Sequence, residues 1–430
     1  MIVGIIGGSD GLGKALINYL KYDFDIFISG RDHKKGREVS DKLGVNYIES
    51  NCELASISDV LIVSVPIHHT SDVICEVASF MKDGSLMVDV TSVKENPLKT
   101  MHDVLPDNVE YIPTHPVFGP RTTDLDNQVI VLTADKKGEW YDKVYDYLKS
   151  KNLRIIETTA SKHDYMMSIV QVLTHFSFIS TAYAIEKLEV NLDETEDYES
   201  PIYNLMIDMI ARIVSQNPFL TYYIQIMNNN GVHVRNVFAD AVCELRDVIN
   251  DSDDDGFIKI AESATRHMGD IKDALGRSDK AITSLSYEFS YLKKSVGFEV
   301  GLKDIYSGEI FVGILDDVNT KHAYLRVNGE IRKFRLAGIR ILTRAELYYW
   351  KLDNYDRIHD KICCRFIDMI NVDIIIDSLC ELYGIEDIDL INIDKYDDNF
   401  VDLTFEVISI YEKDIDNIKK LFVAFGGVIL

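Results

Sequence analysis

The 430-residue sequence is poor in the residues that build a covalent or metal-centred scaffold. Its six cysteines are too few and too scattered for a disulfide framework or a zinc site; they are Cys52, Cys75, Cys243, Cys363, Cys364 and Cys380. Cys363 and Cys364 are adjacent in a strand-like run, so their side chains point to opposite faces of the sheet. We therefore expect free, buried thiols in a reducing compartment and no bound metal.

Cationic residues are also scarce. The chain has 45 Lys and Arg against 70 Asp and Glu, a formal net charge of −25. Such a surface repels nucleic acid and anionic membranes, which excludes both as partners. A small anionic substrate would need a local cluster of basic groups. No apolar run approaches membrane-spanning length and no signal peptide precedes the first strand, so we expect a soluble cytoplasmic protein.

The first fourteen residues, MIVGIIGGSDGLGK, predict a buried strand, a glycine-rich turn and the start of a helix. This order is typical of a dinucleotide fingerprint, in which the turn lets the backbone approach the pyrophosphate at the helix N-terminus. Asp10 stands where the middle glycine of the motif is expected; a glycine-rich hairpin is the alternative interpretation. The cofactor-binding residues predicted in this turn are Gly8, Ser9, Asp10, Gly11, Leu12 and Gly13.

A second strand, residues 24–29, leads to the position that selects between NAD and NADP. An NAD site usually has an acidic residue at the tip of this strand, where it binds the ribose 2′-hydroxyl. Here the tip reads Ser29, Gly30 and Arg31, which suits a 2′-phosphate better. We predict NADP as the cofactor. NAD is the alternative, because Asp32 would become the ribose ligand if the ribose-binding position lay two residues further along the chain.

Strands expected at 45–48, 60–65 and 86–90 alternate with helical patterns, which predicts a parallel, doubly wound sheet. Ligands bind at the carboxyl ends of such strands. The cofactor site therefore also includes Ser64, Val65, Pro66 and Thr91. Three more strands are expected at 109–112, 129–132 and 154–157, and the last two complete the domain.

His115 follows the strand expected at 109–112 and is flanked by two prolines. It is the best candidate for a general base, because imidazole titrates near working pH. A lone histidine is otherwise a structural residue. Ser92 follows the preceding strand and is in a position either to bond His115 or a substrate hydroxyl, or to cap the next helix.

Long helical patterns fill residues 160–294, interrupted by only two prolines. Helices this long and apolar need a partner, and a second copy of the chain is a natural one. Arg212 lies in an apolar run and requires an anionic partner, either a buried acid or a substrate carboxylate. His163 and His175 are twelve residues apart on one helix and face a similar direction; core or surface positions are the default for both.

The last third of the chain returns to strands. Residues 297–347 predict short alternating strands, with a hairpin at Asn328–Gly329. Residues 361–430 follow the β-α-β-β-α-β order of a ferredoxin-like unit. The predicted domains are a Rossmann domain at 1–159, a helical domain at 160–295, a small β segment at 296–347 and a ferredoxin-like α+β module at 348–430.

Five motifs in this order resemble prephenate dehydrogenase in its archaeal form: GGSDGLG, DVTSVK, THPVFGP, SKHDYMMSIVQVLTHF and ARIVSQNP. The resemblance covers residues 1–285. It implies oxidative decarboxylation of prephenate to 4-hydroxyphenylpyruvate with NAD or NADP, in tyrosine biosynthesis. Arogenate is an alternative substrate, and a non-catalytic dinucleotide-sensing regulator is an alternative of another class. Thr221 and Tyr223 depart from the Trp and Asp of bacterial members.

The resemblance also implies residue roles. His115 would accept the proton of the ring hydroxyl, Ser92 would orient it, His175 would line the pocket and Arg212 would bind a substrate carboxylate. With Lys94, Arg212 and His175 would make the pocket locally basic. The family's helical domain implies a homodimer. The C-terminal module has the element order of ligand-sensing ACT domains, with tyrosine as the expected effector near Gly384; an added dimer contact is the alternative.

Overall fold

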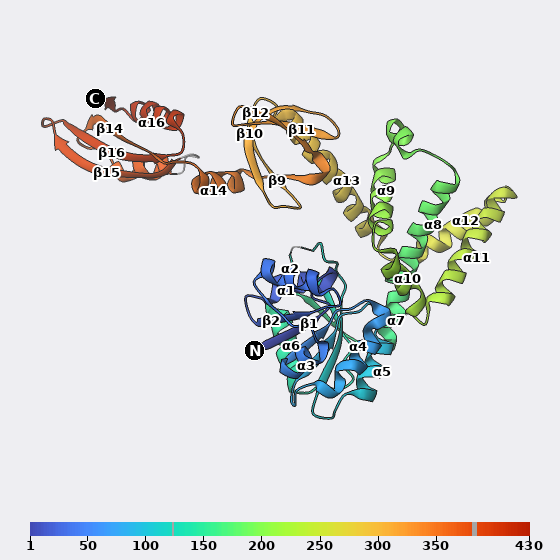
Figure 1. The fold of residues 1–430 in the computed structure, drawn as a ribbon. Coiled ribbons are helices and arrows are strands. Elements are labelled where there is room, and N and C mark those ends of the chain that lie inside the picture. Colours follow the sequence, from blue (N-terminus) through green and yellow to red (C-terminus); the bar gives the residue numbers. More distant parts are fainter. Residues whose placement is uncertain (123, 381–384) are drawn as a thin grey trace. The chain divides into compact units, whose positions relative to one another are not determined.

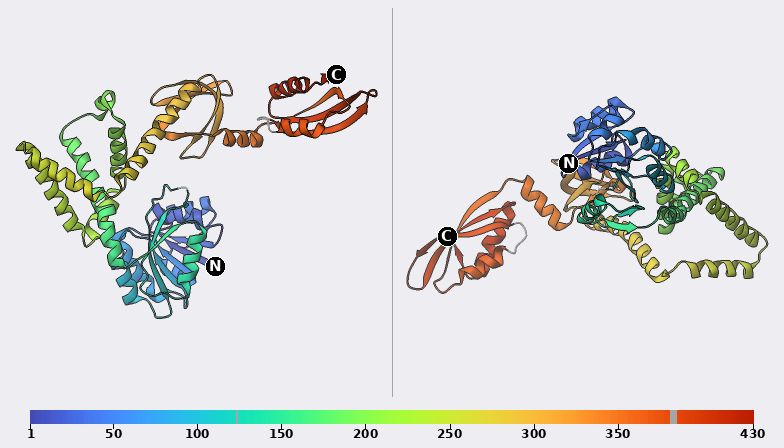
Figure 2. Two further views of the ribbon diagram at one scale, coloured as in Figure 1. Left: turned by 180° about the vertical axis from the view of Figure 1, so that it is seen from behind. Right: turned by 90° about the horizontal axis from the view of Figure 1, so that it is seen from below.

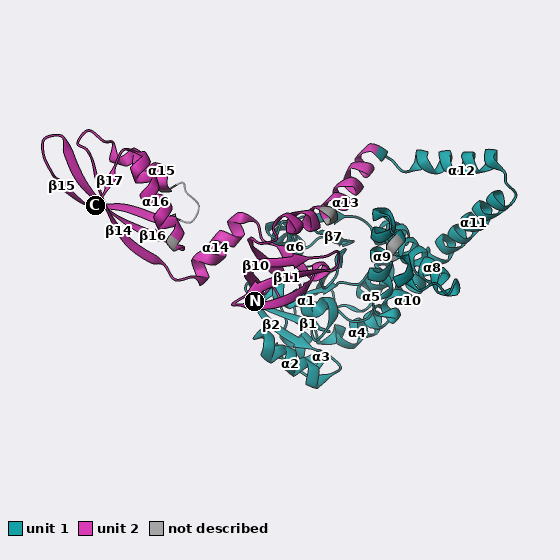
Figure 3. Cartoon of the chain, turned by 90° about the horizontal axis from the view of Figure 1, so that it is seen from above, with its two compact units in different colours: residues 1–271 teal, residues 272–430 magenta. Residues whose placement is uncertain are grey.

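The structure is a computed structural model that describes residues 1–122, 124–380 and 385–430. It divides into two units, Met1–Ile271 and Lys272–Leu430 (Figure 3). The helical domain was expected to extend to residue 295, but helix α13 (Ile271–Lys294) falls almost entirely in the second unit. The reason is that Leu292 of α13 is buried in the core of the β segment that follows it.

The first unit contains an eight-stranded sheet in the order β3-β2-β1-β4-β5-β6-β7-β8. The strand order reverses between β1 and β4, which creates the switch point at which doubly wound sheets bind ligands. Strands β1 to β6 are parallel, and β7 is antiparallel to β6. The bounds are β1 Ile2–Ile6, β2 Asp25–Ser29, β3 Asn46–Tyr47, β4 Val60–Val63, β5 Leu86–Asp89, β6 Glu110–Pro116, β7 Val129–Leu132 and β8 Arg154–Glu157.

Helices cover both faces of this sheet, as the Rossmann prediction requires (Figures 1 and 2). One face packs against α1 (Gly11–Leu20), α2 (His33–Leu43) and α6 (Glu139–Ser150). The other packs against α3 (Asn51–Ile57), α4 (Thr70–Val77) and α5 (Glu95–Val104). The strands are buried on both sides, which explains why β1 and β4 are continuous apolar runs in the sequence.

Strand β6 is longer than expected. The sequence placed His115 beyond the strand end, but β6 continues to Pro116 and His115 lies opposite Val131 of β7. The parallel pairing with β5 stops at Pro113, and the antiparallel pairing with β7 takes over from Thr114. The imidazole is therefore fixed by a paired strand and not by a proline-flanked loop.

The helical part of the first unit follows β8. Its elements are α7 Ala160–Met167, a π-helical turn η3 Ser168–Leu173, α8 Thr174–Lys187, the 3-10 turn η4 Leu192–Tyr198, α9 Pro201–Val214, α10 Pro218–Met227, α11 Gly231–Asn250 and α12 Asp254–His267. By length and composition alone, the 28-residue segment Ala160–Lys187 is apolar enough to cross a membrane, so the expectation that no such run exists is wrong here. A single such helix is weak support for a membrane span, because core helices have the same composition.

The second unit holds two sheets. A five-stranded antiparallel sheet has the order β12-β11-β10-β9-β13. Its strands are β9 Glu299–Asp304, β10 Ile310–Val318, β11 His322–Val327, β12 Glu330–Arg335 and β13 Ile339–Ile341. The predicted hairpin is confirmed, since Asn328 and Gly329 both have positive φ, 51° and 86°, between β11 and β12. Helix α14 (Arg344–Asn354) follows.

The C-terminal sheet has the order β15-β16-β14-β17 and is antiparallel throughout, which confirms the ferredoxin-like topology. Its elements are β14 Ile358–Ile367, α15 Val372–Cys380, β15 Ile385–Lys395, β16 Phe400–Ser409, α16 Glu412–Ala424 and β17 Val428–Ile429. Gly384, the expected effector loop, lies outside the described residues. Five cysteines in the described chain are free, but Cys75 and Cys243 are exposed, contrary to expectation.

Candidate active site

The glycine turn after β1 is held closely against two neighbouring strands. Gly7 has φ +83°, and a Cβ there would lie 2.1 Å from the carbonyl oxygen of Ser64. A Cβ at Gly13 would lie 2.5 Å from the carbonyl oxygen of Gly7. The backbone amides of Gly7 and Gly8 donate to the carbonyl oxygen of Ser29, at 2.9 and 3.3 Å. Only glycine fits at positions 7 and 13, and the result is the tight backbone cradle that a pyrophosphate needs.

Asp10 occupies the middle glycine position because it caps helix α1. Its carboxylate accepts from the backbone N–H of Gly11 at 2.8 Å and pairs with the Lys35 ammonium. The hydrogen bond from Lys35 lowers the pKa of Asp10, and the Gly11 N–H adds to this shift. A fixed negative charge therefore lies at the helix terminus where a pyrophosphate would bind, and Lys35 compensates it.

The residues predicted to bind the ribose at the end of β2 have different environments in the structure. The Ser29 side chain is fully buried and donates to Oδ1 of Asn51 at 2.8 Å, so its hydroxyl is not available to a cofactor. Asp32 caps helix α2 by accepting from the backbone N–H of Lys35 at 3.0 Å. Arg31 is exposed. Two opposite charges are thus exposed at this strand end, the Arg31 guanidinium and the Asp32 carboxylate, and Asp32 is engaged as a helix cap through Oδ1.

The remaining predicted cofactor residues lie along the adjacent strand ends. Ser64 and Val65 are partly exposed and Pro66 is exposed, next to the glycine turn. Thr91 is 5% exposed, and its hydroxyl lies 2.6 Å from Oδ2 of Asp89. Thr91 therefore orients Asp89. Because its side chain is buried, it is not available to a cofactor, which corrects the predicted contact. The cradle as a whole still fits a dinucleotide.

His115 is 3% exposed and is linked to two residues of α7. Its Nδ1 lies 2.9 Å from Nε2 of His163, and Nδ1 of His163 lies 2.7 Å from Oδ1 of Asp164. A carboxylate accepts only, so with neutral rings His163 donates from Nδ1 and accepts at Nε2. His115 then donates from Nδ1. This chain of hydrogen bonds leaves Nε2 of His115 without a hydrogen, with its lone pair outside the relay.

The electrostatics favour the same form of His115. Burial lowers the pKa of His115 well below its ordinary value of 6.5, and the nearby His163 and Lys94 lower it further. Nε2 of Gln171 lies 3.4 Å from Nε2 of His115, as expected for an acceptor nitrogen. The ring is a neutral base with its accepting nitrogen directed away from the relay.

Asp164 is fixed by the start of helix α5. Its Oδ1 accepts from the backbone N–H of Lys94 at 2.8 Å, and its Oδ2 accepts from that of Glu95 at 3.0 Å. The carboxylate thus caps the N-terminus of helix α5 by accepting from two backbone N–H groups. Nδ2 of Asn228 also donates to the Asp164 carbonyl oxygen at 2.7 Å.

Lys94 has a different role from the one predicted. Its side chain is fully buried, and its ammonium pairs with Asp89 and donates to the carbonyl oxygen of Thr114 at 2.6 Å. Burial lowers the pKa of Lys94 while the Asp89 carboxylate opposes that shift. Because its charge is already compensated inside the protein, Lys94 joins β5 to β6 and does not supply a cation to a substrate.

Ser92 was expected to orient His115, and His175 was expected to line the substrate pocket. Ser92 is partly exposed, and within the described chain no side-chain hydrogen bond joins it to His115; His163 takes that place. His175 is 9% exposed, and burial lowers its pKa. Its Nδ1 and Oε1 of Gln171 are both buried without a hydrogen-bond partner among the described residues. Buried polar groups of this kind need a hydrogen-bond partner, which a polar ligand or an ordered water would supply.

Arg212 lies on α9 and is exposed, although its neighbours in sequence are apolar. Of the two anionic partners expected for Arg212, the buried acid is wrong, because the side chain is exposed; the substrate carboxylate stays a prediction. No ion pair to Arg212 occurs among the residues that the structure describes. Its charge remains available to an anionic ligand.

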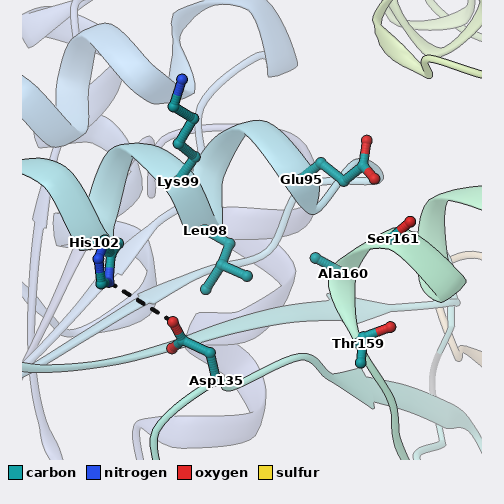
Figure 4. Close-up of a pocket in the computed structure, with 8 residues that line it drawn as sticks. All are labelled: Glu95, Leu98, Lys99, His102, Asp135, Thr159, Ala160 and Ser161. Carbon is teal, nitrogen blue, oxygen red and sulfur yellow. Dashed lines mark ion pairs between the residues drawn. The ribbon is translucent and has the colours of Figure 1, made fainter.

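A surface hollow lies beside α5, lined by Glu95, Leu98, Lys99, His102, Asp135, Thr159, Ala160 and Ser161 (Figure 4). Nδ1 of His102 lies 3.8 Å from Oδ2 of Asp135, and both side chains are solvated. Exposed pairs of this kind contribute little energy. None of the described lining residues belongs to the His115 relay. The hollow is therefore separate from the candidate active site.

Sequence reasoning missed Asp164 and Gln171, and it gave His163 only a default core or surface position. His163 and Asp164 are adjacent polar residues in the sequence, and they are 2% and 1% exposed. Gln171 and His175 are four residues apart, the spacing that puts side chains on one helix face. The π-helical turn η3 lies between His163 and His175 and changes the register that a regular helix would give. That change could not be read from the spacing alone.

Comparisons with known proteins agree with the two parts of the first unit. A family model described as prephenate dehydrogenase, nucleotide-binding domain, matches residues 17–157, and one described as prephenate dehydrogenase, dimerization domain, matches residues 159–263. A Methanocaldococcus jannaschii protein described as probable arogenate/prephenate dehydrogenase is 36% identical over 427 residues, covering 98% of this chain and 96% of the relative.

More distant relatives cover less of this chain. The T-protein of Haemophilus influenzae is 28% identical over 267 residues, covering 62% of this chain and 67% of that protein. A solved structure, prephenate dehydrogenase from A. aeolicus in complex with hydroxyphenyl propionate and NAD+, superposes with a TM-score of 0.51 at 15% identity. It covers 62% of this chain and 96% of its own. At that identity the likeness shows the fold alone.

Proposed function

Because the chain belongs to the prephenate dehydrogenase family, we propose that it catalyses the NADP-dependent oxidative decarboxylation of prephenate to 4-hydroxyphenylpyruvate, a step of tyrosine biosynthesis. The observation that carries this proposal is the buried relay from Asp164 through His163 to His115. It supplies a neutral base with one free ring nitrogen, which is what removal of a hydroxyl proton requires.

The chemistry assigns one task to each group. When bound, NADP accepts the hydride from the ring carbon that carries the hydroxyl. Nε2 of His115 takes the hydroxyl proton as the carbon–oxygen double bond forms. Loss of carbon dioxide then leaves a phenolate, and His115 can return the proton to its oxygen. The protein's contribution is to position the ring and to hold this proton at one nitrogen.

The preference for NADP rests on the end of β2. Arg31 is an exposed cation there, and the exposed Asp32 is engaged through Oδ1 as the cap of α2. A guanidinium suits a 2′-phosphate, whereas an NAD site needs a free carboxylate for the ribose hydroxyl. NAD is the alternative cofactor in this proposal.

Arg212 is proposed to bind a substrate carboxylate, because it is an exposed cation without an acidic partner among the described residues. Arg212→Ala should then raise the Kd for prephenate by roughly 10-fold or more, the loss expected for a charged hydrogen bond, and leave NADP affinity unchanged. Calorimetry with each ligand measures both. An equal loss of NADP affinity would identify a structural role.

We also propose a homodimer formed through the helical part. Large apolar side chains stay exposed there, among them Val170 at 52%, Tyr183 at 54% and Ile202 at 72%. A patch of such residues is typical of an interface between copies. Light scattering of the full chain tests this, and a monomer at assay concentration would contradict it.

Turnover assays test the proposed activity directly. The purified chain is given prephenate or arogenate with NADP+ or NAD+, and formation of reduced nicotinamide is followed. We expect the highest kcat/KM with prephenate and NADP+. Faster turnover of arogenate, which has an amino group in place of the keto group, would correct the substrate. No turnover with any of the four combinations would favour a regulator that only binds dinucleotides.

A further inference from the structure

Four side chains form a continuous run from the cofactor end of β2 to helix α10. Nη1 of Arg31 lies 3.4 Å from Nε2 of His69. The rings of His69 and His68 have centroids 4.0 Å apart, and His68 stacks on Tyr223 at 3.8 Å with an interplanar angle of 17°. His68 and His69 belong to the 3-10 turn η1 (Ile67–His69), which directly follows Pro66 of the predicted cofactor site.

The turn η1 is anchored to the helical part of the unit. Ile67 is buried in one cluster with Val93, Val172 and Ile224, and Tyr223 packs against the same cluster. The positions of His68 and His69 are therefore set by α10 and not only by their own strand. Nδ1 of His68 is buried without a hydrogen-bond partner among the described residues, so the stack on Tyr223 is its main constraint.

The charges around this run point to an anionic ligand. Arg31 bonds an imidazole nitrogen, and no described carboxylate forms an ion pair with its guanidinium. Burial lowers the pKa of His68, and the nearby His69 and Arg31 lower it further. The Asp72 carboxylate acts in the opposite direction and raises that pKa. Because a guanidinium only donates, Nε2 of His69 accepts from Arg31, and a neutral ring then donates from Nδ1. An uncompensated guanidinium beside this N–H donor suits a phosphate better than a neutral hydroxyl.

We propose that His69 binds the ribose 2′-phosphate of NADP together with Arg31, and that Tyr223 positions His69 through its stack on His68. This inference rests on the proposed use of NADP. Neither His69 nor Tyr223 belongs to the predicted cofactor site. The consequence is that a residue of the helical part contributes to the choice of cofactor in the Rossmann part.

The test measures binding of NADP+ and NAD+ to the full chain by calorimetry, with adenosine 2′,5′-bisphosphate and ADP as probes of the adenosine end alone. His69→Ala should weaken NADP+ and the bisphosphate by roughly 10-fold to 10²-fold, the range for one charge-assisted hydrogen bond. Binding of NAD+ and ADP should not change. His102→Ala, a solvated histidine in the hollow beside α5, is the matched control.

Tyr223 is tested by a pair of variants. Tyr223→Phe keeps the stacked ring and should bind both nucleotides as the wild type does, whereas Tyr223→Leu should weaken NADP+ alone. A structural role would instead weaken NADP+ and NAD+ equally in Tyr223→Leu, which would overturn the inference. Unchanged NADP+ preference in His69→Ala would overturn it too, while leaving the proposed cofactor intact. Tighter NAD+ binding by the wild type would contradict the proposed cofactor itself.

Discussion

A buried imidazole serves as a base only when one ring nitrogen keeps its lone pair, and two residues hold His115 in that form. Asp164 determines which nitrogen of His163 carries a hydrogen, and His163 determines the same for His115. The helix start at Lys94 and Glu95 fixes Asp164 in turn. The orientation of the base therefore depends on residues that never touch a substrate, as in other hydrogen-bonded relays.

His115→Asn should lower kcat by roughly 10²–10⁴-fold, the contribution expected of a general base. Asparagine keeps a polar side chain of similar length, so we expect the fold and NADP binding to persist. Steady-state kinetics and calorimetry measure the two effects. His102→Asn, which changes a solvated histidine in the hollow beside α5, is the control and should keep wild-type kcat. Wild-type kcat in His115→Asn would remove the assignment.

The pH profile provides an independent check. Because burial lowers the pKa of His115 well below 6.5, the ring stays neutral and able to accept a proton as the pH falls through 6.5. We expect kcat/KM to remain constant across that pH and to decline only at lower values, where His115 becomes protonated. An acid limb at or above 6.5 would show that another group controls the rate, or that His115 is not shielded from water.

At the scale of elements, the sequence predicts what depends on local pattern. Alternation of apolar strands with amphipathic helices predicts the Rossmann sheet, and the Asn328–Gly329 dipeptide predicts its hairpin. The order of elements alone predicts the ferredoxin-like unit. Each of these depends on neighbours in the chain, so one sequence is enough.

Side-chain partners far apart in the chain were not predictable. His115 was expected in a loop, because the antiparallel pairing that extends β6 comes from β7. Lys94 was expected to face a substrate, but Asp89 and Thr114 enclose its ammonium. Arg212 was expected to contact either a buried acid or a substrate carboxylate, and its exposure excludes the first, since apolar neighbours in sequence do not show which way a helix faces. In each case the error concerns the direction of a side chain, which tertiary packing decides.

The glycine turn and α1 carry a prediction of their own. Asp10→Gly restores the middle glycine and removes a carboxylate from the pyrophosphate end of the helix. We expect severalfold tighter NADP+ binding, since the charge no longer repels the phosphates. The loss of the cap should be small, a few tenths of a kcal/mol, because glycine is tolerated at that position. Calorimetry and thermal unfolding measure the two effects.

The companion variant Lys35→Met should change NADP+ affinity in the opposite direction. Without the ammonium, the Asp10 carboxylate is no longer compensated, so NADP+ binding should weaken. The two changes together should come close to Asp10→Gly alone, because Lys35 then has no carboxylate to compensate. Weaker NADP+ binding in Asp10→Gly would mean that the carboxylate orders the turn more than it repels the phosphates.

For the whole molecule, the question is what the second unit adds to a dehydrogenase whose relatives can lack it. The family models end at residue 263, and the ferredoxin-like module lies beyond them. Its core is complete within itself, with β14, β16 and α16 supplying Phe366, Phe405 and Phe422. Fold alone does not assign it a ligand, and an added contact between copies is as compatible with this packing as a regulatory site.

We propose the regulatory role: tyrosine, the end product of the pathway, binds the ferredoxin-like module and inhibits by favouring a less active state of the dimer. Calorimetry of tyrosine into the full chain should give heat, with phenylalanine as the control that lacks the hydroxyl. Tyrosine also resembles the reaction product, so binding to the module must be distinguished from binding at the active site. Inhibition through the module lowers kcat at saturating prephenate, whereas binding at the active site is overcome by prephenate. No heat together with unchanged activity would leave the module as a contact between copies.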